Sequence, residues 1–173
     1  MCTGLIFVIL NSRKYWTVLM KIRVILVSKF RDKSYENIVN EYIKRISGFG
    51  EAELIELPDS KIGSLDNDGT MSERGVEKIL KQTENHYLIS LDLTGKHFSS
   101  ENFASWFKER VELHRKLAFL IGPSGGLSKS LTEKSNELIS LSKLTFAHKI
   151  AAVVLFEQIY RAICINTNHP YHK

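Results

Sequence analysis

The sequence predicts one α/β domain with a mostly parallel sheet. Strand-like and helix-like stretches alternate four times with short links, which is the pattern of an α/β protein. The first strand-like run, Ile22 to Ser28, consists almost entirely of β-branched residues and leucine, as in a parallel strand covered on both faces. A chain of 173 residues with 43% apolar content is large enough for a single domain with a normal core.

A helix and a second strand follow the first strand. Apolar residues between Tyr35 and Ile46 recur at helical spacing, with charged and amide residues on the opposite face, as in an amphipathic helix. Gly48 and Gly50 are expected to end this helix. The apolar run Leu54 to Leu57 predicts a second strand that Pro58 stops.

The next stretch predicts a loop that leads into a second helix. Residues 59–69 are largely polar, contain two glycines and show no periodicity, which is typical of a loop or crossover. Thr70 and Glu73 have the spacing of a capping box. We therefore expect Thr70 to cap a helix whose apolar face includes Val76 and Leu80.

Two more strands and a third helix complete the alternation. Tyr87 to Leu93 predicts the third strand, with a turn over residues 92–96 at its carboxyl end. Ser99 or Ser100 is expected to cap the helix that follows. Leu117 to Ile121 predicts the fourth strand. Because ligands of parallel sheets bind beyond the carboxyl ends of strands, we expect a site at the ends of the third and fourth strands.

A glycine-rich loop, Gly122-Pro123-Ser124-Gly125-Gly126, lies at one of these ends. It precedes a helix that Ser128 or Ser130 is expected to cap, and small residues there let a ligand approach the backbone. The loop is neither a Walker A loop nor G-x-G-x-x-G. It matches the G-x-S-x-G nucleophile elbow with Ser124 as nucleophile, although no aspartate follows Ser124. A plain tight turn between strand and helix is the third alternative.

The following segments predict an edge strand and a long helix. Leu141 to Phe146 alternates apolar and polar residues, as in a half-buried edge strand. Every residue from Ile150 to Phe156 is apolar, so the start of this helix is buried in the core or against a second subunit. Glu157 and Arg161 have the i, i+4 spacing of an ion pair, which lies in a polar cleft or on a solvated face.

The C-terminal segment, Asn166 to Lys173, reads N-T-N-H-P-Y-H-K. Amides, an aromatic ring and two imidazoles are residue types that stack on bases, bind phosphates and move protons. A frayed chain end is the alternative.

The charge and cysteine content set limits on partners. A formal net charge of +5 and a pI near 9.2 favour a polyanionic partner without identifying one. Cys2 and Cys164 have no spacing typical of a zinc site or a disulfide framework. We expect no metal.

Residues 1–19 are expected to be an upstream extension that takes no part in the fold. The apolar run Leu5 to Leu10 is too short to span a bilayer and lacks the flanks of a signal peptide. The run that starts at Met20 has the pattern of a cytoplasmic protein opening on its first strand. We therefore expect the domain to cover residues 20–173 and to need no membrane.

Five motifs occur in a characteristic order and spacing: D-L-T-G-K after the third strand, L-I-G before the glycine-rich loop, L-S-K-L-T-F-A-H, E-Q-I-Y-R-A and the terminal N-H-P-Y-H. Together they resemble the ribosomal RNA large subunit methyltransferase H family, a small single-domain branch of the SPOUT methyltransferases. The resemblance covers Met20 to Lys173. It implies a SPOUT-type α/β fold with a mostly parallel five-stranded sheet, flanking helices, a C-terminal trefoil knot and a homodimer.

The resemblance also implies an activity and a set of site residues. Such enzymes use S-adenosyl-L-methionine to methylate N3 of a pseudouridine in 23S rRNA, as free RNA or in the assembled ribosome. The cofactor contacts carried over from the family are Leu91, Gly122, Leu141, Ser142, Lys143, Leu144, Thr145 and Phe146. The candidates for positioning the base or handling its proton, across the dimer, are Arg161, His169, Tyr171 and His172, and those for binding RNA are Arg161 and Lys173.

Two departures from the family pattern bear on the site. Relatives usually have G-G-P-E-G in the loop, whereas this chain has G-P-S-G-G, in which Pro123 removes a backbone donor. Lys173 stands where relatives usually have arginine, so a bidentate phosphate contact is reduced to a point charge. A non-catalytic RNA- or ribosome-binding module of the same fold and a serine hydrolase using Ser124 are the alternative functions.

Overall fold

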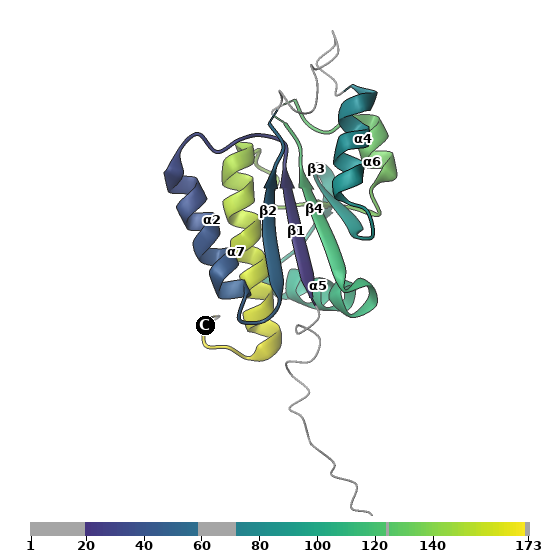
Figure 1. The fold of residues 1–173 in the computed structure, drawn as a ribbon. Coiled ribbons are helices and arrows are strands. Elements are labelled where there is room, and N and C mark those ends of the chain that lie inside the picture. The colour runs from purple at the N-terminus through teal and green to yellow at the C-terminus, as the bar shows by residue number, and fades with distance from the viewer. Residues whose placement is uncertain (1–19, 59–71, 124, 172–173) are drawn as a thin grey trace, which may run out of the picture.

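Five parallel strands form one sheet within residues 20–58, 72–123 and 125–171, which the computed structural model describes (Figure 1). The strand order is β2-β1-β4-β3-β5, and every neighbouring pair is parallel. The fold class predicted from the sequence is thus confirmed, while the trefoil knot stays a prediction. The strands are β1 (Lys21–Leu26), β2 (Glu51–Glu56), β3 (Tyr87–His97), β4 (Lys116–Ile121) and β5 (Glu137–Ser140).

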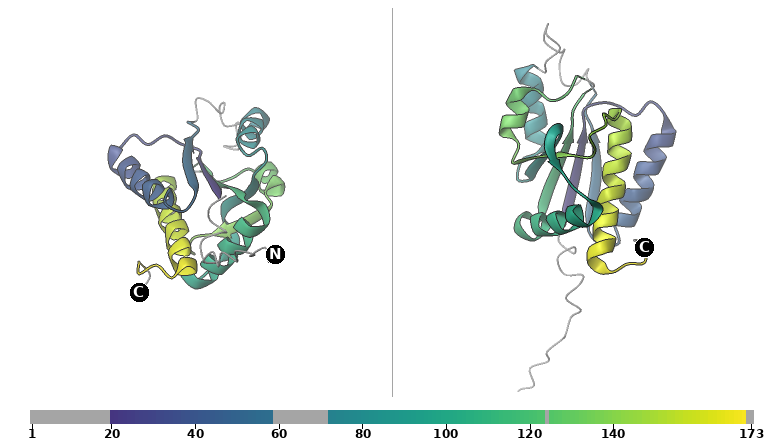
Figure 2. Two further views of the ribbon diagram at one scale, coloured as in Figure 1. Left: turned by 60° about the horizontal axis from the view of Figure 1, so that its bottom comes forward. Right: turned by 180° about the vertical axis from the view of Figure 1, so that it is seen from behind.

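Helices cover both faces of this sheet (Figures 1 and 2). The strands alternate their side chains between two apolar clusters, because successive residues of a strand point to opposite faces. One cluster holds Val24 and Phe119 together with residues of α2, α5 and α7, and the other holds Ile25 and Leu120 together with residues of α4 and α6. The helices are α2 (Lys33–Ile46), α4 (Glu73–Gln82), α5 (Ser100–His114), α6 (Lys129–Lys134) and α7 (His148–Thr167).

Most predicted helix boundaries agree with the structure, and one cap was wrong. Asp32 caps α2 by accepting a hydrogen bond from Ser34 N at 2.8 Å, and Ser99 caps α5 through Asn102 N at 3.2 Å. The cap of α4 is Ser72, whose Oγ accepts from Gly75 N at 3.3 Å, and not Thr70, which lies outside the described residues. Glu73 is therefore the first residue of α4, where its charge favours the amino end of the helix.

The third strand does not end at Leu93 as predicted but continues to His97. Leu91 and Lys96 both lie opposite Ile139 of β5, so the residues between them bulge out of the ladder. Within this bulge, Asp92 Oδ1 accepts hydrogen bonds from the backbone N–H and the hydroxyl of Thr94 at 2.8 and 2.6 Å. The predicted turn is thus present, but it is an insertion within β3, which pairs with β5 again after the turn.

The predicted edge strand over residues 141–146 was also wrong. The edge strand is β5, which ends at Ser140. Ser140 Oγ donates to the carbonyl of Ser142 at 2.8 Å, and Ser142 Oγ accepts from Leu144 N at 3.0 Å. These local bonds compete with pairing to a neighbouring strand, so the chain turns there despite its alternating pattern.

The helix α7 is a core element. By length and composition alone it could cross a membrane, but half of its most apolar stretch is buried within the domain. It packs against α2 and α5. The predicted burial all round its first turns holds only in part, since Ile150, Val153 and Val154 on one face are half-buried. These three residues leave a partly exposed apolar strip.

The close approach of Gly95 to β5 leads to a stability prediction. A Cβ at Gly95 would lie 2.5 to 2.7 Å from the backbone of Ile139, which cannot yield without moving the strand. We expect Gly95→Ala to lower the free energy of unfolding by about 2 kcal/mol or more, as overpacking does. Gly48→Ala is the matched control, because its Cβ would meet only Arg45 O at 3.6 Å. Equal urea midpoints for the two variants would refute the prediction.

Candidate functional site

A pocket of about 720 Å³ lies at the carboxyl ends of β3, β4 and β5. This volume suits a small organic ligand. Three segments far apart in the sequence form its wall together with the start of α7. Of the predicted cofactor contacts, the wall includes Leu91, Gly122, Leu141, Ser142, Leu144, Thr145 and Phe146.

The glycine-rich loop keeps one side of this pocket open. Gly126 N–H donates to Pro123 O at 2.9 Å, and Gly126 has a φ of +86°, which favours glycine. A Cβ at Gly122 would lie 2.8 Å from Leu127 Cδ2. Any side chain at Gly122 would therefore push Leu127 aside and fill space at the strand end. Ser124, the hydrolase candidate, lies outside the described residues.

The segment 141–147 forms the facing wall without regular secondary structure. The Ser140 and Ser142 side chains hold its turn by the hydrogen bonds described above. Thr145 is exposed at the pocket, and Leu144 is 71% exposed. Lys143, which the resemblance assigned to the cofactor, is exposed and does not line the pocket.

Sequence reasoning missed part of the wall. His148 and Ala151, from the first turn of α7, line the pocket and were not among the predicted contacts. Asp92 and Leu93, from the bulge in β3, also line it, at the strand end where the sequence predicted a site. Nothing in the local pattern indicated that the amino end of α7 reaches the same place.

The predicted residues of the C-terminal segment gather in a second cluster. Arg161 donates to Glu157 Oε1 at 2.6 Å, and Tyr171 OH donates to the same oxygen at 3.3 Å. The Arg161 guanidinium lies 5.1 Å from the centre of the Tyr171 ring, which in turn packs against Tyr160. We call Arg161, His169 and Tyr171, with the residues packed on them, the tail cluster.

His169 joins the tail cluster because the backbone reverses after α7. Asn168 adopts a left-handed conformation with φ of 53°, and His169 N–H donates to Cys164 O at 2.8 Å. The His169 ring makes edge contacts with Phe49 and Tyr160. The described part of the C-terminal segment is therefore packed and not frayed, while His172 and Lys173 lie outside the described residues.

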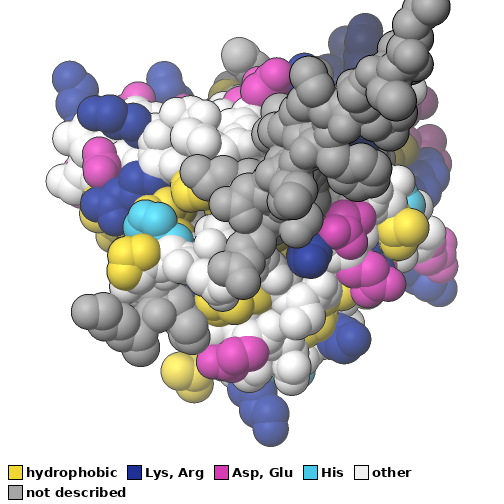
Figure 3. Space-filling model, turned by 90° about the horizontal axis from the view of Figure 1, so that it is seen from below, with side chains coloured by type: hydrophobic (Ala, Val, Ile, Leu, Met, Phe, Trp, Pro, Cys, Tyr) yellow, Lys and Arg dark blue, Asp and Glu magenta, His cyan; other side chains and the backbone are white. Residues whose placement is uncertain are grey.

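Sequence reasoning also missed Arg45, which α2 contributes to the tail cluster. Its guanidinium lies 5.6 Å from the Tyr42 ring and 5.8 Å from the Tyr160 ring. Seen from below, basic, histidine and hydrophobic side chains lie together at the edge under α2 and α7 (Figure 3). Basic residues in the last turn of the helix were the only signal in the sequence.

Electrostatics set the protonation of the tail cluster. Burial, and then a hydrogen bond with Tyr42, raises the pKa of Tyr171 above its ordinary value. The hydrogen bond to Glu157 raises the pKa of Arg161. At neutral pH, Tyr171 therefore keeps its proton and Arg161 its charge, so both act as hydrogen-bond donors.

The pocket and the tail cluster lie at opposite ends of α7. The amino end of α7 is in the pocket wall, and its carboxyl end leads to the tail cluster at the opposite edge of the sheet (Figures 1 and 2). A helix of 20 residues is roughly 30 Å long. One chain therefore does not bring its own tail cluster to its own pocket.

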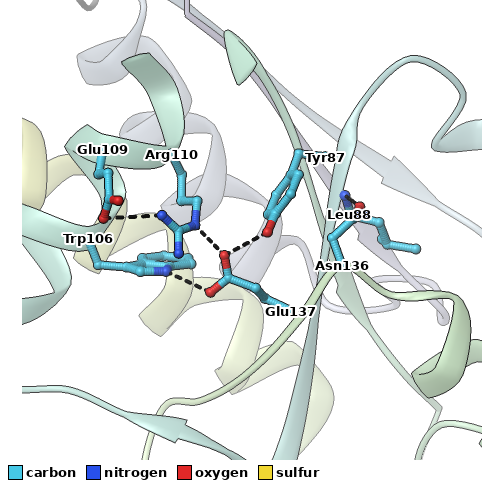
Figure 4. Close-up of polar contacts among 7 residues, drawn as sticks. All are labelled: Tyr87, Leu88, Trp106, Glu109, Arg110, Asn136 and Glu137. Carbon is cyan, nitrogen blue, oxygen red and sulfur yellow. Dashed lines mark hydrogen bonds and ion pairs between the residues drawn. The ribbon is translucent and has the colours of Figure 1, made fainter. Parts of the chain in front are cut away.

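A half-buried carboxylate fixes the strand that leads into the pocket wall (Figure 4). Glu137, the first residue of β5, accepts hydrogen bonds from Trp106 Nε1 at 2.9 Å, from Tyr87 OH at 2.8 Å and from Arg110 Nε. Burial alone raises the pKa of Glu137, but these three bonds outweigh it and lower the pKa below its usual range. Glu137 thus ties β5 to β3 and α5 as a carboxylate.

A family model described as "Predicted SPOUT methyltransferase" matches residues 20–172. The chain belongs to the SPOUT methyltransferase family. The match leaves residues 1–19 uncovered.

Individual relatives within the SPOUT family carry a more specific name. Proteins from Clostridium acetobutylicum, Enterococcus faecalis and Bacillus thuringiensis are 39%, 38% and 37% identical to this chain over 159 residues. Each alignment covers 89% of this chain and 100% of the relative. All three are named "Ribosomal RNA large subunit methyltransferase H". The resemblance noted from the sequence motifs is thereby confirmed.

Proposed function

We propose that this SPOUT family member transfers a methyl group from S-adenosyl-L-methionine to N3 of a pseudouridine in 23S rRNA, as a cytoplasmic homodimer. The observation that carries the proposal is the pocket, in which Leu91, Gly122 and Phe146 line one cavity although they are far apart in sequence. The name of the relatives, a ribosomal RNA methyltransferase, supports the class of substrate.

The pocket residues fit such a cofactor. Its wall combines apolar side chains with the backbone of the glycine-rich loop and of residues 141–147, which suits an adenosine with an aliphatic tail. Gly122 leaves room at the strand end that a Cβ would fill. When bound, S-adenosyl-L-methionine supplies a methyl group on a sulfonium centre, which needs no further activation.

The tail cluster would hold the nucleotide. Arg161, kept charged by Glu157, is suited to a phosphate, and Tyr171, kept protonated, would donate its hydroxyl proton to a base carbonyl in place of Glu157. Tyr171 is consequently not the group that accepts the N3 proton. His169, with a ring that packs against Tyr160, supports the arrangement of the Tyr171 segment through its Nδ1, which accepts from Tyr171 N at 3.3 Å.

The distance along α7 supports a dimer. Because the pocket and the tail cluster of one chain are separated by the length of α7, a complete site needs the tail cluster of a second copy. The half-buried face of α7, with Ile150, Val153 and Val154, is an apolar surface suited to contact with that copy.

The first test is calorimetry of the purified protein with S-adenosyl-L-methionine. We expect saturable binding with one molecule per chain. In a second arm, ribosomes and free 23S rRNA from a deletion strain are incubated with protein and cofactor, and N3-methylpseudouridine is measured by mass spectrometry. Saturable binding without any methylation of either substrate would contradict the proposed transfer.

A non-catalytic RNA-binding module is the second candidate, because Pro123 removes a backbone donor from the loop beside the pocket. The calorimetric arm separates the two. A non-enzyme of this fold gives no saturable heat with the cofactor but still binds RNA.

A further inference from the structure

The loop between β1 and α2 is a rigid support for three cations. Phe30 is buried, its N–H donates to Glu56 Oε1 at 2.6 Å, and its ring stacks on Tyr35 with centres 6.3 Å apart. This anchor in the middle of the loop leaves Lys29, Arg31 and Lys33 exposed on the surface around it. The loop therefore presents positive charge from a fixed backbone.

This loop lies at the edge of the sheet where the pocket opens. Val27 N–H donates to the carbonyl of Ile121, which is part of the pocket wall. Hydrogen bonds from Ser34 lower the pKa of Asp32, and the positive charge of Lys149 lowers it further. Lys149, in the first turn of α7 beside the pocket, is thus close enough to the loop to act on it.

Two further cations lie on or next to the segments that form the pocket wall. Lys149 follows His148 of the pocket wall, and Lys143 projects from the segment 141–147 that forms the facing wall. Lys143 is exposed and is not one of the residues that line the pocket. We define the basic rim as Lys29, Arg31, Lys33, Lys143 and Lys149.

The carboxylates beside the basic rim are held by backbone N–H groups and not by ion pairs with its cations. Asp32, Glu56 and Asp92 each accept a hydrogen bond from a backbone N–H of their own surroundings. Within the part of the chain that the structure describes, no member of the basic rim has a carboxylate within ion-pair distance. By contrast, cations elsewhere are paired, as Lys21 is with Glu51 and Arg161 with Glu157.

We propose that the basic rim binds the phosphates on both sides of the nucleotide that enters the pocket. The inference rests on the proposed function, since it takes RNA as the substrate. Four of the five cations are exposed and Lys149 is half-buried, and they belong to separate segments next to the pocket, which suits a charged backbone passing over it and not a single anion. Such contacts fix the register of the RNA and leave the choice of base to the pocket and the tail cluster.

The test compares two triple variants of equal charge. In the rim variant, Lys29→Gln, Arg31→Gln and Lys33→Gln are combined. In the control, Lys81→Gln, Lys108→Gln and Lys116→Gln remove the same charge at the edge opposite the strand carboxyl ends. Binding of a fluorescent 23S rRNA stem-loop is followed by anisotropy across a range of salt concentrations.

The expected result is a change of salt dependence confined to the rim variant. Each lost phosphate contact lowers the slope of log K against log salt by roughly 0.7 for a single strand, so the rim variant should lose about 2. Its affinity at low salt should fall by about 10-fold or more, while the control keeps a slope near that of the wild type. Calorimetry should give an unchanged cofactor affinity for both variants.

The outcomes separate the basic rim from the proposed function. Phosphate binding by the basic rim is overturned if the rim variant has the same salt slope as the wild type. It is also overturned if both triple variants lose the same amount of slope and RNA affinity. If the wild-type protein transfers no methyl group, the proposed function is overturned. The salt slopes still test phosphate binding by the basic rim, because they need only RNA binding. Lys143→Gln with Lys149→Gln is the second variant, and it should lower the slope by about 1.4.

Discussion

Replacing Glu137 by alanine is expected to lower the free energy of unfolding by about 3 kcal/mol. The Glu137 carboxylate accepts three hydrogen bonds, from Trp106, Tyr87 and Arg110. Its removal leaves the indole N–H of the buried Trp106 and the guanidinium of Arg110 without this acceptor. Because Glu137 begins β5, which leads into Ser140 and Leu141 of the pocket wall, affinity for S-adenosyl-L-methionine should fall as well. Urea unfolding and calorimetry measure the two effects.

The control for Glu137 is Glu112→Ala, which removes a carboxylate from an exposed i, i+4 pair with Lys108. This change should alter stability by less than about 0.5 kcal/mol.

The contribution of Glu137 to stability should depend on pH, since the folded state lowers the pKa of Glu137. This contribution is full above the unfolded carboxyl pKa of about 4.3 and is lost as pH falls through the lowered pKa. The difference in free energy of unfolding between Glu137→Ala and the wild type should therefore become smaller as the pH is lowered. A difference that stays constant down to acidic pH would contradict the ionised state of Glu137.

Two inactive variants are expected to restore methyl transfer when they share a dimer. Gly122→Val fills the pocket, and Arg161→Ala removes the guanidinium of the tail cluster. Each variant alone should lose about 100-fold or more in methylation rate, the scale of effect from misplaced reactants. Mixed dimers contain one site with an intact pocket and an intact tail cluster. After unfolding and refolding of an equal mixture, about one quarter of wild-type activity should return, because half the dimers are mixed and each has one good site.

The control for this experiment combines both changes in one chain and refolds it with wild type. The mixed dimers then hold two sites with one defect each, so they add no activity to that of the wild-type dimers. Circular dichroism of each variant checks that it folds. If the mixture of single variants stays as inactive as its parts, the pocket and tail cluster of different chains do not form one site.

Much of the architecture could be predicted from local patterns. The continuous apolar run at the start of the domain corresponds to β1, a strand buried on both faces. The helical periodicity from Tyr35 to Ile46 corresponds to α2, a helix buried on one face. The pocket could be placed at the strand ends from Leu91 and Gly122 because parallel strands end at the same edge. The choice of a methyl-transfer site among other ligand sites came from the resemblance and not from periodicity.

The remaining features depend on side-chain bonds or on contacts between distant residues. The alternation from Leu141 to Phe146 suggested a strand, but the hydroxyl of Ser142 turns the backbone through a local bond that apolar periodicity does not reveal. Nothing local reveals that Gly95 lies against Ile139, so the return of β3 to its partner could not be predicted. Arg45 joins the tail cluster only because α2 packs on α7. For Gly95 and Arg45 the deciding partner lies far away in the sequence.

The length of α7 constrains how two copies can assemble in the proposed homodimer. In that dimer, α7 contributes to the pocket wall of one site at its amino end and leads to the tail cluster of the other site at its carboxyl end. If one subunit slid along its partner by a helical turn, roughly 5.4 Å, both proposed sites would be misaligned in the same movement. Selection on the contact between copies would then also be selection on catalytic alignment, and a substitution on the half-buried apolar face of α7 would abolish methyl transfer while leaving each subunit well folded.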